Sequence, residues 1–228
     1  RSWKIETPVA QAIHPGSYID AGAGLTAGEA TPALTLECWV RLWNLSCHQG
    51  VITQFDEAEP GGFGLVVEAD RAVAFYTGAS GTIAKKAFRT APDALTSPGE
   101  RDPDLTIPTA QWHHLVATVD GRQIEIYVDA ARVGRWEADE PLHPGGAPLR
   151  VGAFGTAGKA DGLLDADVAM PTIYGRALSE DEIKERFSGQ ALTPPAPEEL
   201  LACWPLNEES GAHVADISGH ERHGQIVN

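Results

Sequence analysis

The fold of this chain is decided by one stretch of sequence, Leu34-Thr35-Leu36-Glu37-Cys38-Trp39-Val40-Arg41-Leu42-Trp43. Apolar and polar residues alternate in it, and successive side chains of a β-strand point to opposite faces of the sheet. One face therefore carries only apolar side chains, and it predicts contact with a core. The other face carries Glu37, Trp39, Arg41 and Trp43, so two indoles are expected on a side that is otherwise polar.

Further short apolar runs predict more strands, separated by many turns. The 228 residues include 24 glycines and 16 prolines, and this punctuation is typical of an all-β sandwich. Asp120-Gly121 predicts a hairpin turn, because glycine adopts the positive φ that such turns need. A single short helix is predicted over residues 179–187, with Ser179 as N-cap and Glu182 completing a capping box. The other strands are expected at residues 64–68, 72–77, 112–119, 123–128, 149–152, 166–174 and 200–206.

The charge composition excludes two classes of partner. The chain has 17 Lys and Arg residues against 32 Asp and Glu residues, which gives a formal net charge of −15 at pH 7. Nucleic acids and anionic membranes require clustered Lys and Arg, so we expect neither as a partner. No apolar stretch approaches the roughly 18 residues of a membrane span. The chain starts with Arg1-Ser2-Trp3-Lys4, without Met or a signal-peptide core, and we expect a module of a longer protein.

The cysteines carry little chemistry. Cys38, Cys47 and Cys203 are an odd number at no metal-like spacing. They predict neither a zinc site nor a disulfide framework, and they favour a reducing compartment such as the cytoplasm.

A series of segments then points to a family. In order along the chain they are residues 35–42, Gln111 to Gly121, Ile126 to Asp129, Leu149 to Gly152, residues 162–165 and Tyr174 to Ser179. In this order and spacing they resemble laminin G-like domains of the concanavalin A-like jelly-roll superfamily. The resemblance covers most of residues 16–187. It implies an all-β, two-sheet antiparallel jelly-roll sandwich, to which the pattern above adds one short C-terminal helix.

The C-terminal residues resemble the motif that usually opens such a domain, namely Trp204-Pro205-Leu206 followed by Glu209-Ser210-Gly211 and Asp216 to Gly224. Either the domain is circularly permuted, with residues 200–228 as its closing segment, or a second module begins there. Jelly rolls bring their termini close together, so we predict a single domain over residues 1–228. In that case Trp204 and Leu206, the larger side chains of their strand, should point inward.

The order of segments, with His14-Pro15-Gly16-Ser17-Tyr18 at the front, also resembles the large subunit of bacterial N,N-dimethylformamidase-like proteins. That resemblance implies an amidohydrolase whose iron is held by tyrosines and a glutamate in a separate region of the chain. No such motif can be placed in this sequence.

Catalysis within this module is not expected. Glycan-cleaving enzymes of the concanavalin A-like fold resemble one another in carrying Glu-x-Asp-x-x-Glu, which sets two carboxylates across the scissile bond. Here Glu68-Ala69-Asp70 is followed by Val73, and Glu137-Ala138-Asp139 is followed by Leu142. Each candidate therefore lacks its second carboxylate.

A calcium-binding site is more credible than a catalytic site in this sequence. Asp216 lies in an Asp-x-Ser-Gly loop, where a hard cation could take its carboxylate together with backbone carbonyls near His220 and His223. In laminin G-like jelly rolls a carboxylate matching Asp165 often lies near that loop, so the resemblance implies Asp165 as a second ligand. The alternative is that Asp216 caps a turn through its own backbone. Zinc held by His220 and His223 would need a third ligand, and none is evident.

The tryptophans have two interpretations. Trp39, Trp43, Trp112 and Trp136 could stack against sugar rings, because an exposed indole suits the apolar face of a pyranose. Sandwich tryptophans are more often packed under loops or the terminal helix. Trp39 and Trp43 share their polar face with Arg41, so these three residues are the candidate ligand-binding set. The adjacent His113 and His114 point to opposite faces, and we expect one to be packed and the other solvated.

The sequence thus predicts a non-catalytic, carbohydrate-binding-like recognition or scaffolding module of a larger bacterial enzyme. Its partner would be a glycan or a neighbouring domain of the same polypeptide. The alternative is a structural domain of an N,N-dimethylformamidase-like amidohydrolase large subunit, with catalysis elsewhere in the chain.

Overall fold

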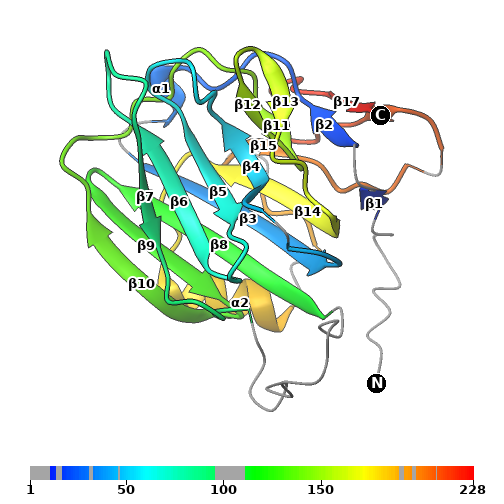
Figure 1. The fold of residues 1–228 in the computed structure, drawn as a ribbon. Helices are drawn as coiled ribbons and strands as arrows, with labels where there is room; N and C mark the ends of the chain where they lie inside the picture. The colour runs from blue at the N-terminus through cyan, green and yellow to red at the C-terminus, as the bar shows by residue number, and fades with distance from the viewer. Residues whose placement is uncertain are drawn as a thin grey trace.

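Two antiparallel β-sheets lie face to face in the computed structural model of this protein (Figure 1). The structure describes residues 11–13, 17–30, 33–45, 47–95, 111–189, 193–196, 199–208 and 210–228. Of the N-terminal motif, residues 14–16 lie outside these ranges. No helix in the described ranges has the length and apolar character of a membrane span.

The first sheet, called sheet A, holds the strand that decides the fold. Its strands are β1 (Gln11–Ile13), β3 (Ala33–Leu42), β8 (Trp112–Asp120), β9 (Gln123–Val128), β10 (Ala131–Glu137), β14 (Ala166–Tyr174) and β15 (Leu200–Cys203). They follow the order β1-β14-β3-β8-β9-β10, and β15 pairs with the far end of β14. The strand β3 is central and pairs along its whole length with β8.

The second sheet, called sheet B, covers the inner face of sheet A. Its strands are β2 (Tyr18–Asp20), β4 (Gln49–Gln54), β5 (Phe63–Val67), β6 (Val73–Gly78), β7 (Lys85–Arg89), β11 (Arg150–Val151), β16 (His213–Val214) and β17 (Gly224–Val227). Their order is β16-β17-β2-β11-β4-β5-β6-β7. A separate hairpin is formed by β12 (Phe154–Thr156) and β13 (Lys159–Asp161). The predicted all-β jelly-roll sandwich is confirmed.

Alternation along β3 places the core as predicted. The side chains of Leu34, Leu36, Cys38 and Val40 are fully buried and face the inner strands of sheet B within one apolar cluster. On the opposite, more polar face, Glu37 and Trp39 are buried as well. A helix covers them, which alternation within a strand cannot reveal.

That helix is α2 (Glu180–Ser188), and it lies on the side of sheet A that faces away from sheet B (Figure 1). Its N-terminus is as predicted, because Ser179 is the N-cap and forms the full capping box with Glu182. Ile183 is completely buried in a small cluster between α2 and the sheet. A second helix of four residues, α1 (Ala27–Ala30), was not predicted.

The C-terminal residues contribute strands to both sheets. The strand β15 pairs with β14 in sheet A, whereas β17 pairs with β2 in sheet B. Trp204 and Leu206 point inward and are fully buried, as expected from their size. Just before β2, the Ser17 hydroxyl donates to Asn228 Oδ1 at 2.6 Å, so the C-terminal residue lies beside the start of β2. The extent of the single domain, residues 1–228, stays a prediction that the truncation below tests.

Candidate functional site

Two of the three predicted ligand-binding residues lie together where β3 ends. Arg41 pairs in register with Trp112 of β8 on one side and with Asp167 of β14 on the other, so the three side chains share the outer face of sheet A. The guanidinium carbon lies 5.0 Å from the ring centroid of Trp43 and 5.2 Å from that of Trp112. Arg41, Trp43, Trp112 and Asp167 are called the Arg41 surface below.

The Arg41 surface is both ordered and open. The Nε atom of Arg41 donates to Asp167 Oδ2 at 2.7 Å, and its Nη2 atom contacts the same oxygen. This ion pair fixes the guanidinium between the two indoles, where each ring face attracts the cation. Trp43 is 48% exposed and is one of the few large apolar side chains that the described surface shows. The arrangement offers an indole face beside a charged pair.

Trp39, the third predicted ligand-binding residue, is buried beside this surface, in a small cluster against which Trp112 packs. It is only 7% exposed and stacks on Phe187 of α2, with ring centroids 5.7 Å apart and an interplanar angle of 13°. The structure therefore favours packing, the alternative that the sequence left open for the tryptophans. The physical reason is that α2 crosses the polar face of β3 at Trp39 and ends before Arg41.

Beneath α2 lies a buried polar network centred on Glu37. Its carboxylate accepts from His114 Nε2 at 2.7 Å, from the Tyr174 hydroxyl at 2.6 Å and from Arg186 Nη2 at 3.0 Å. Burial alone would raise the pKa of Glu37, but the hydrogen bond and charge of His114 and the charge of Arg186 outweigh it and lower the pKa to about 2. Burial and the Glu37 charge raise the pKa of Tyr174, so its hydroxyl keeps the proton that it donates.

This network corrects one prediction and adds residues that the sequence did not mark. Neither of the adjacent histidines is solvated, because His114 is fully buried under α2 and His113 is 6% exposed. The His113 ring contacts Asp129 at 2.9 Å. Glu37 on the outer face of β3 was the available signal, since a carboxylate next to Trp39 on that face needs a partner if anything covers it.

The Asp216 loop is saturated by donors from its own chain. Asp216 Oδ1 accepts from the backbone N–H groups of Cys203 at 2.9 Å and Ser218 at 3.0 Å. Its Oδ2 accepts from the Ser218 hydroxyl at 2.7 Å and from the Arg222 N–H at 3.0 Å. Four donors on two oxygens are what a turn-capping carboxylate needs, and they leave little room for a cation.

Asp165 lies far from this loop. It precedes β14 at the end that pairs with Leu42, whereas Asp216 binds the backbone of Cys203, which pairs with Thr172. At about 3.3 Å per residue, roughly 20 Å of strand separates the two carboxylates. The structure therefore does not bring the two implied calcium ligands together.

The histidines of the loop do not fit a metal site either. His223 Nδ1 accepts from the Asp216 N–H at 3.1 Å. A neutral imidazole with Nδ1 as acceptor carries its proton on Nε2, so it has no lone pair left for a metal. His220 is exposed. Within the described residues no group of three or more His, Cys, Asp or Glu side chains could hold a metal ion. Calcium binding stays a prediction that these residues do not favour.

One feature of the surface was not anticipated from the sequence. A cleft of about 580 Å³ opens at the turn between β8 and β9 and against β10. It is called the β10 cleft, and its lining residues are Asp120, Arg122, Gln123, Arg135, Trp136 and Glu137. Trp136 had been noted only as one of four tryptophans. The other lining residues come together through the register of neighbouring strands, which no local sequence pattern specifies.

Comparisons with known proteins agree with this architecture. A family model described as the concanavalin A-like lectin/glucanases superfamily matches residues 15–184, about three quarters of the chain. The N,N-dimethylformamidase beta subunit of Paracoccus aminophilus is 26% identical over 250 aligned positions, which include 93% of this chain. The chain spans only 30% of that relative's length. Both resemblances noted in the sequence are thus confirmed.

Solved structures share the fold at low identity. A candidate carbohydrate-binding protein of Bacteroides ovatus ATCC 8483 superposes with a TM-score of 0.66 at 15% identity, covering 96% of this chain and 58% of that chain. The Ruminococcus gnavus IT-sialidase CBM40 gives a TM-score of 0.59 at 12% identity, covering 77% of this chain and 95% of that chain. At these identities the similarity establishes the fold alone. With its sandwich and the matched residues 15–184, the chain belongs to the concanavalin A-like lectin/glucanase superfamily.

Proposed function

We propose that this chain is a non-catalytic carbohydrate-recognition domain of a larger bacterial enzyme and that the Arg41 surface binds the sugar. The observation that carries the proposal is the exposed Trp43 indole beside the Arg41 and Asp167 ion pair. An indole face suits the apolar face of a pyranose, and a guanidinium and a carboxylate suit its hydroxyls. The R. gnavus module of the same fold, solved bound to α2,3-sialyllactose, supports this ligand class.

The candidate catalytic carboxylates support a role without catalysis, because each is already engaged by a neighbour. Glu68 accepts from the Tyr76 hydroxyl at 2.6 Å, and Asp70 pairs with Arg89 at 2.6 Å. Glu137 pairs with Arg122, and Asp139 pairs with Lys86 at 2.8 Å.

Titration with sugars tests the proposal. We expect lactose or α2,3-sialyllactose to bind the wild type and to change the signal of the Trp43 indole. Trp43→Ala should weaken binding by about fivefold to tenfold, since a lost ring contact is worth about 1–1.4 kcal/mol. Ile83→Ala is the matched control, because Ile83 is 57% exposed and lies outside the Arg41 surface. Equal affinity of Trp43→Ala and wild type would overturn the proposal.

A second candidate function is a structural domain of an amidohydrolase large subunit. The observation that favours it is the match to 93% of this chain but only 30% of the P. aminophilus subunit. In that case the exposed Trp43 would lie against a neighbouring domain of the parent chain. Hydroxyl-radical footprinting separates the two functions. Protection of Trp43 in the parent chain, relative to residues 1–228 alone, supports the structural role, and equal labelling supports a free sugar-binding surface.

A further inference from the structure

We propose that the Arg41 surface selects a neutral pyranose over sugars that carry a carboxylate, and that Asp167 sets this selectivity. The inference rests on the proposed function, because it names the class of sugar for the same surface. Three features carry it: a guanidinium that is already neutralised, a free donor and acceptor that match hydroxyls, and a second carboxylate beside Trp43. Of the two probes of the proposed function, lactose is then expected to bind more tightly than α2,3-sialyllactose.

The charge of the Arg41 guanidinium is already balanced within the protein. Its Nε atom donates to Asp167 Oδ2 at 2.7 Å, and its Nη2 atom contacts the same oxygen. The Asp167 side chain is only 5% exposed, whereas that of Arg41 is 31% exposed. A carboxylate at this depth keeps its counterion, because an unpaired buried charge is strongly unfavourable. The carboxylate of a ligand would therefore have to compete with Asp167 for the one guanidinium of the Arg41 surface.

The ion pair leaves one donor and one acceptor for a ligand. Arg41 Nη1 and Asp167 Oδ1 have no hydrogen-bond partner among the described residues, and neither is one of their fully buried polar atoms. Hydroxyls both donate and accept, so neighbouring hydroxyls of a pyranose can accept from Nη1 and donate to Oδ1. An ionised carboxylate only accepts, and it would lie against Oδ1 without a proton to share. The two free atoms therefore match a diol better than an acid.

A second carboxylate makes the potential of this surface more negative. Asp165 lies opposite Trp43, because the Trp43 N–H donates to the Asp165 carbonyl at 2.9 Å. Two residues along each chain, Arg41 and Asp167 are register partners, and residues two apart on a strand share a face. The Asp165 side chain is half-buried and makes no ion pair with a described residue. One guanidinium thus lies beside two carboxylates, which repels an anionic ligand.

Two glycosides that differ at a single carbon test the inference. Methyl β-glucopyranoside is neutral, whereas methyl β-glucuronide carries a carboxylate in place of the hydroxymethyl group. Each is titrated into the 228-residue protein at low salt, because salt screens contacts between exposed charges. The NMR signals of the Trp43 and Trp112 indole N–H groups report binding. We expect the neutral glycoside to bind about threefold to fivefold more tightly, the effect of one unfavourable charge contact at an exposed surface.

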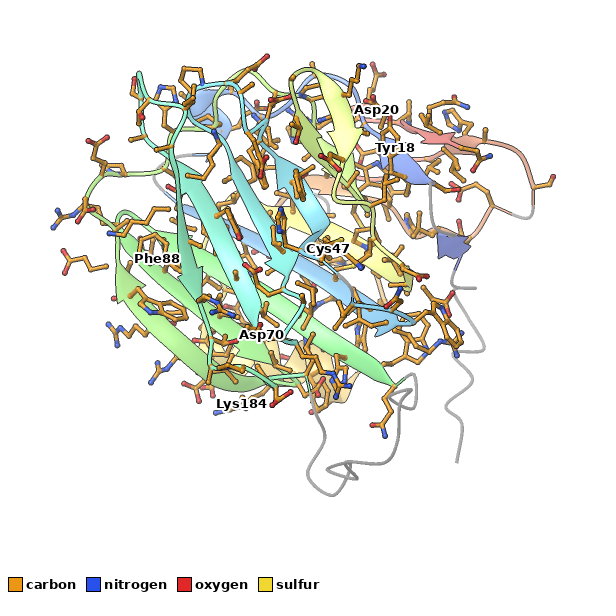
Figure 2. All side chains as sticks on the ribbon, viewed as in Figure 1. Tyr18, Asp20, Cys47, Asp70, Phe88 and Lys184 are labelled. Carbon is orange, nitrogen blue, oxygen red and sulfur yellow. The ribbon has the colours of Figure 1, made fainter. Side chains whose placement is uncertain are left out.

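The variant Asp167→Asn should reverse this preference. The amide keeps the shape of the side chain but frees Arg41 to bind the carboxylate of the ligand through charge-assisted hydrogen bonds. We expect the variant to bind the glucuronide about threefold to fivefold more tightly than the wild type does. Asp70→Asn is the matched control, because Asp70 also pairs with an arginine, Arg89, at 2.6 Å. Asp70 lies at the turn between β5 and β6 of sheet B (Figure 2), and its variant should keep the wild-type preference.

The possible results separate this inference from the proposed function. Equal or tighter binding of the glucuronide by the wild type would overturn the inference and leave the Arg41 surface as a sugar site. An Asp167→Asn variant that is folded by circular dichroism and still prefers the neutral glycoside would show that Asp167 does not set the selectivity. If neither glycoside nor lactose shifts the indole signals, the proposed function itself fails. The wild-type comparison needs no variant, so it decides the selectivity even if Asp167→Asn does not fold.

Discussion

At the scale of single residues, Glu37 is a buried carboxylate whose charge three neighbours compensate. Its carboxylate has no exposed surface and depends on His114, Tyr174 and Arg186 for compensation. Removing one partner of a buried ion pair leaves an uncompensated charge. We therefore expect Glu37→Gln to lower the free energy of unfolding by about 3–5 kcal/mol in urea melts. Glu185→Gln, on the exposed side of α2, should change it by less than about 0.5 kcal/mol. Similar values for the two variants would contradict this role.

The same residue predicts a dependence of stability on pH. The pKa of Glu37 is lowered to about 2 in the folded protein, whereas an unfolded glutamate titrates near about 4.3. The unfolded chain therefore takes up the proton first, and the stabilisation is complete above pH about 4.3 and lost as the pH falls toward about 2. Urea melts across this window should give a shallower pH dependence for Glu37→Gln than for the wild type. Parallel curves would argue against the lowered pKa.

Trp204 is the residue that ties the C-terminal segment to the core. It has no exposed surface, and its Nε1 donates to the Arg222 carbonyl at 2.8 Å. Trp204→Ala should lower the free energy of unfolding by roughly 3–5 kcal/mol, the range for emptying a large aromatic site. Trp43→Ala is the exposed counterpart and should cost less than about 1 kcal/mol, because it loses mainly a cation–π contact. Comparable denaturant midpoints for the two variants would mean that Trp204 is not a core residue.

At the scale of elements, the loop of Asp216 can be tested for its role, which is either to cap a turn or to bind calcium. Its four hydrogen bonds are complete without a metal, so we expect the wild-type melting temperature to be equal in EDTA and in millimolar calcium. Asp216→Ala should lower the melting temperature by the same amount in both, because the donors of Cys203 and Ser218 lose their acceptor. A rise with calcium that Asp216→Ala abolishes would instead establish the calcium site predicted from the sequence.

The helices and strands also differ in how well their own sequences predict them. Alternation defined β3 to within a residue at each end, and the capping box defined the start of α2, because both signals are local. The strand β4 was not predicted, since its six residues are all buried and show no alternation. The β10 cleft was not predicted because its lining comes from three strands whose pairing sets which side chains meet.

At the scale of the whole molecule, residues 200–228 decide whether the chain is one domain. They add β15 to sheet A and β17 to sheet B, so their removal would open both sheets and expose the site of Trp204. A protein that ends at Gln190 should be insoluble or melt without cooperativity, as followed by circular dichroism and size-exclusion chromatography. If residues 1–190 folded with undiminished stability, the C-terminal segment would belong to another module and the single-domain prediction would be wrong.

By itself, the sequence determined the fold class, the core face of β3 and the helix that follows β14. Those properties depend on period-two alternation and on residues a few positions apart. The tertiary structure alone decided which polar-face residues of β3 are available. It placed α2 over Glu37 and Trp39 and left Arg41 and Trp43 uncovered, although all four share one face of one strand. The reason is that the cover comes from about 150 residues further along the chain, as Arg186 on Glu37 illustrates, and no local pattern encodes where it lies.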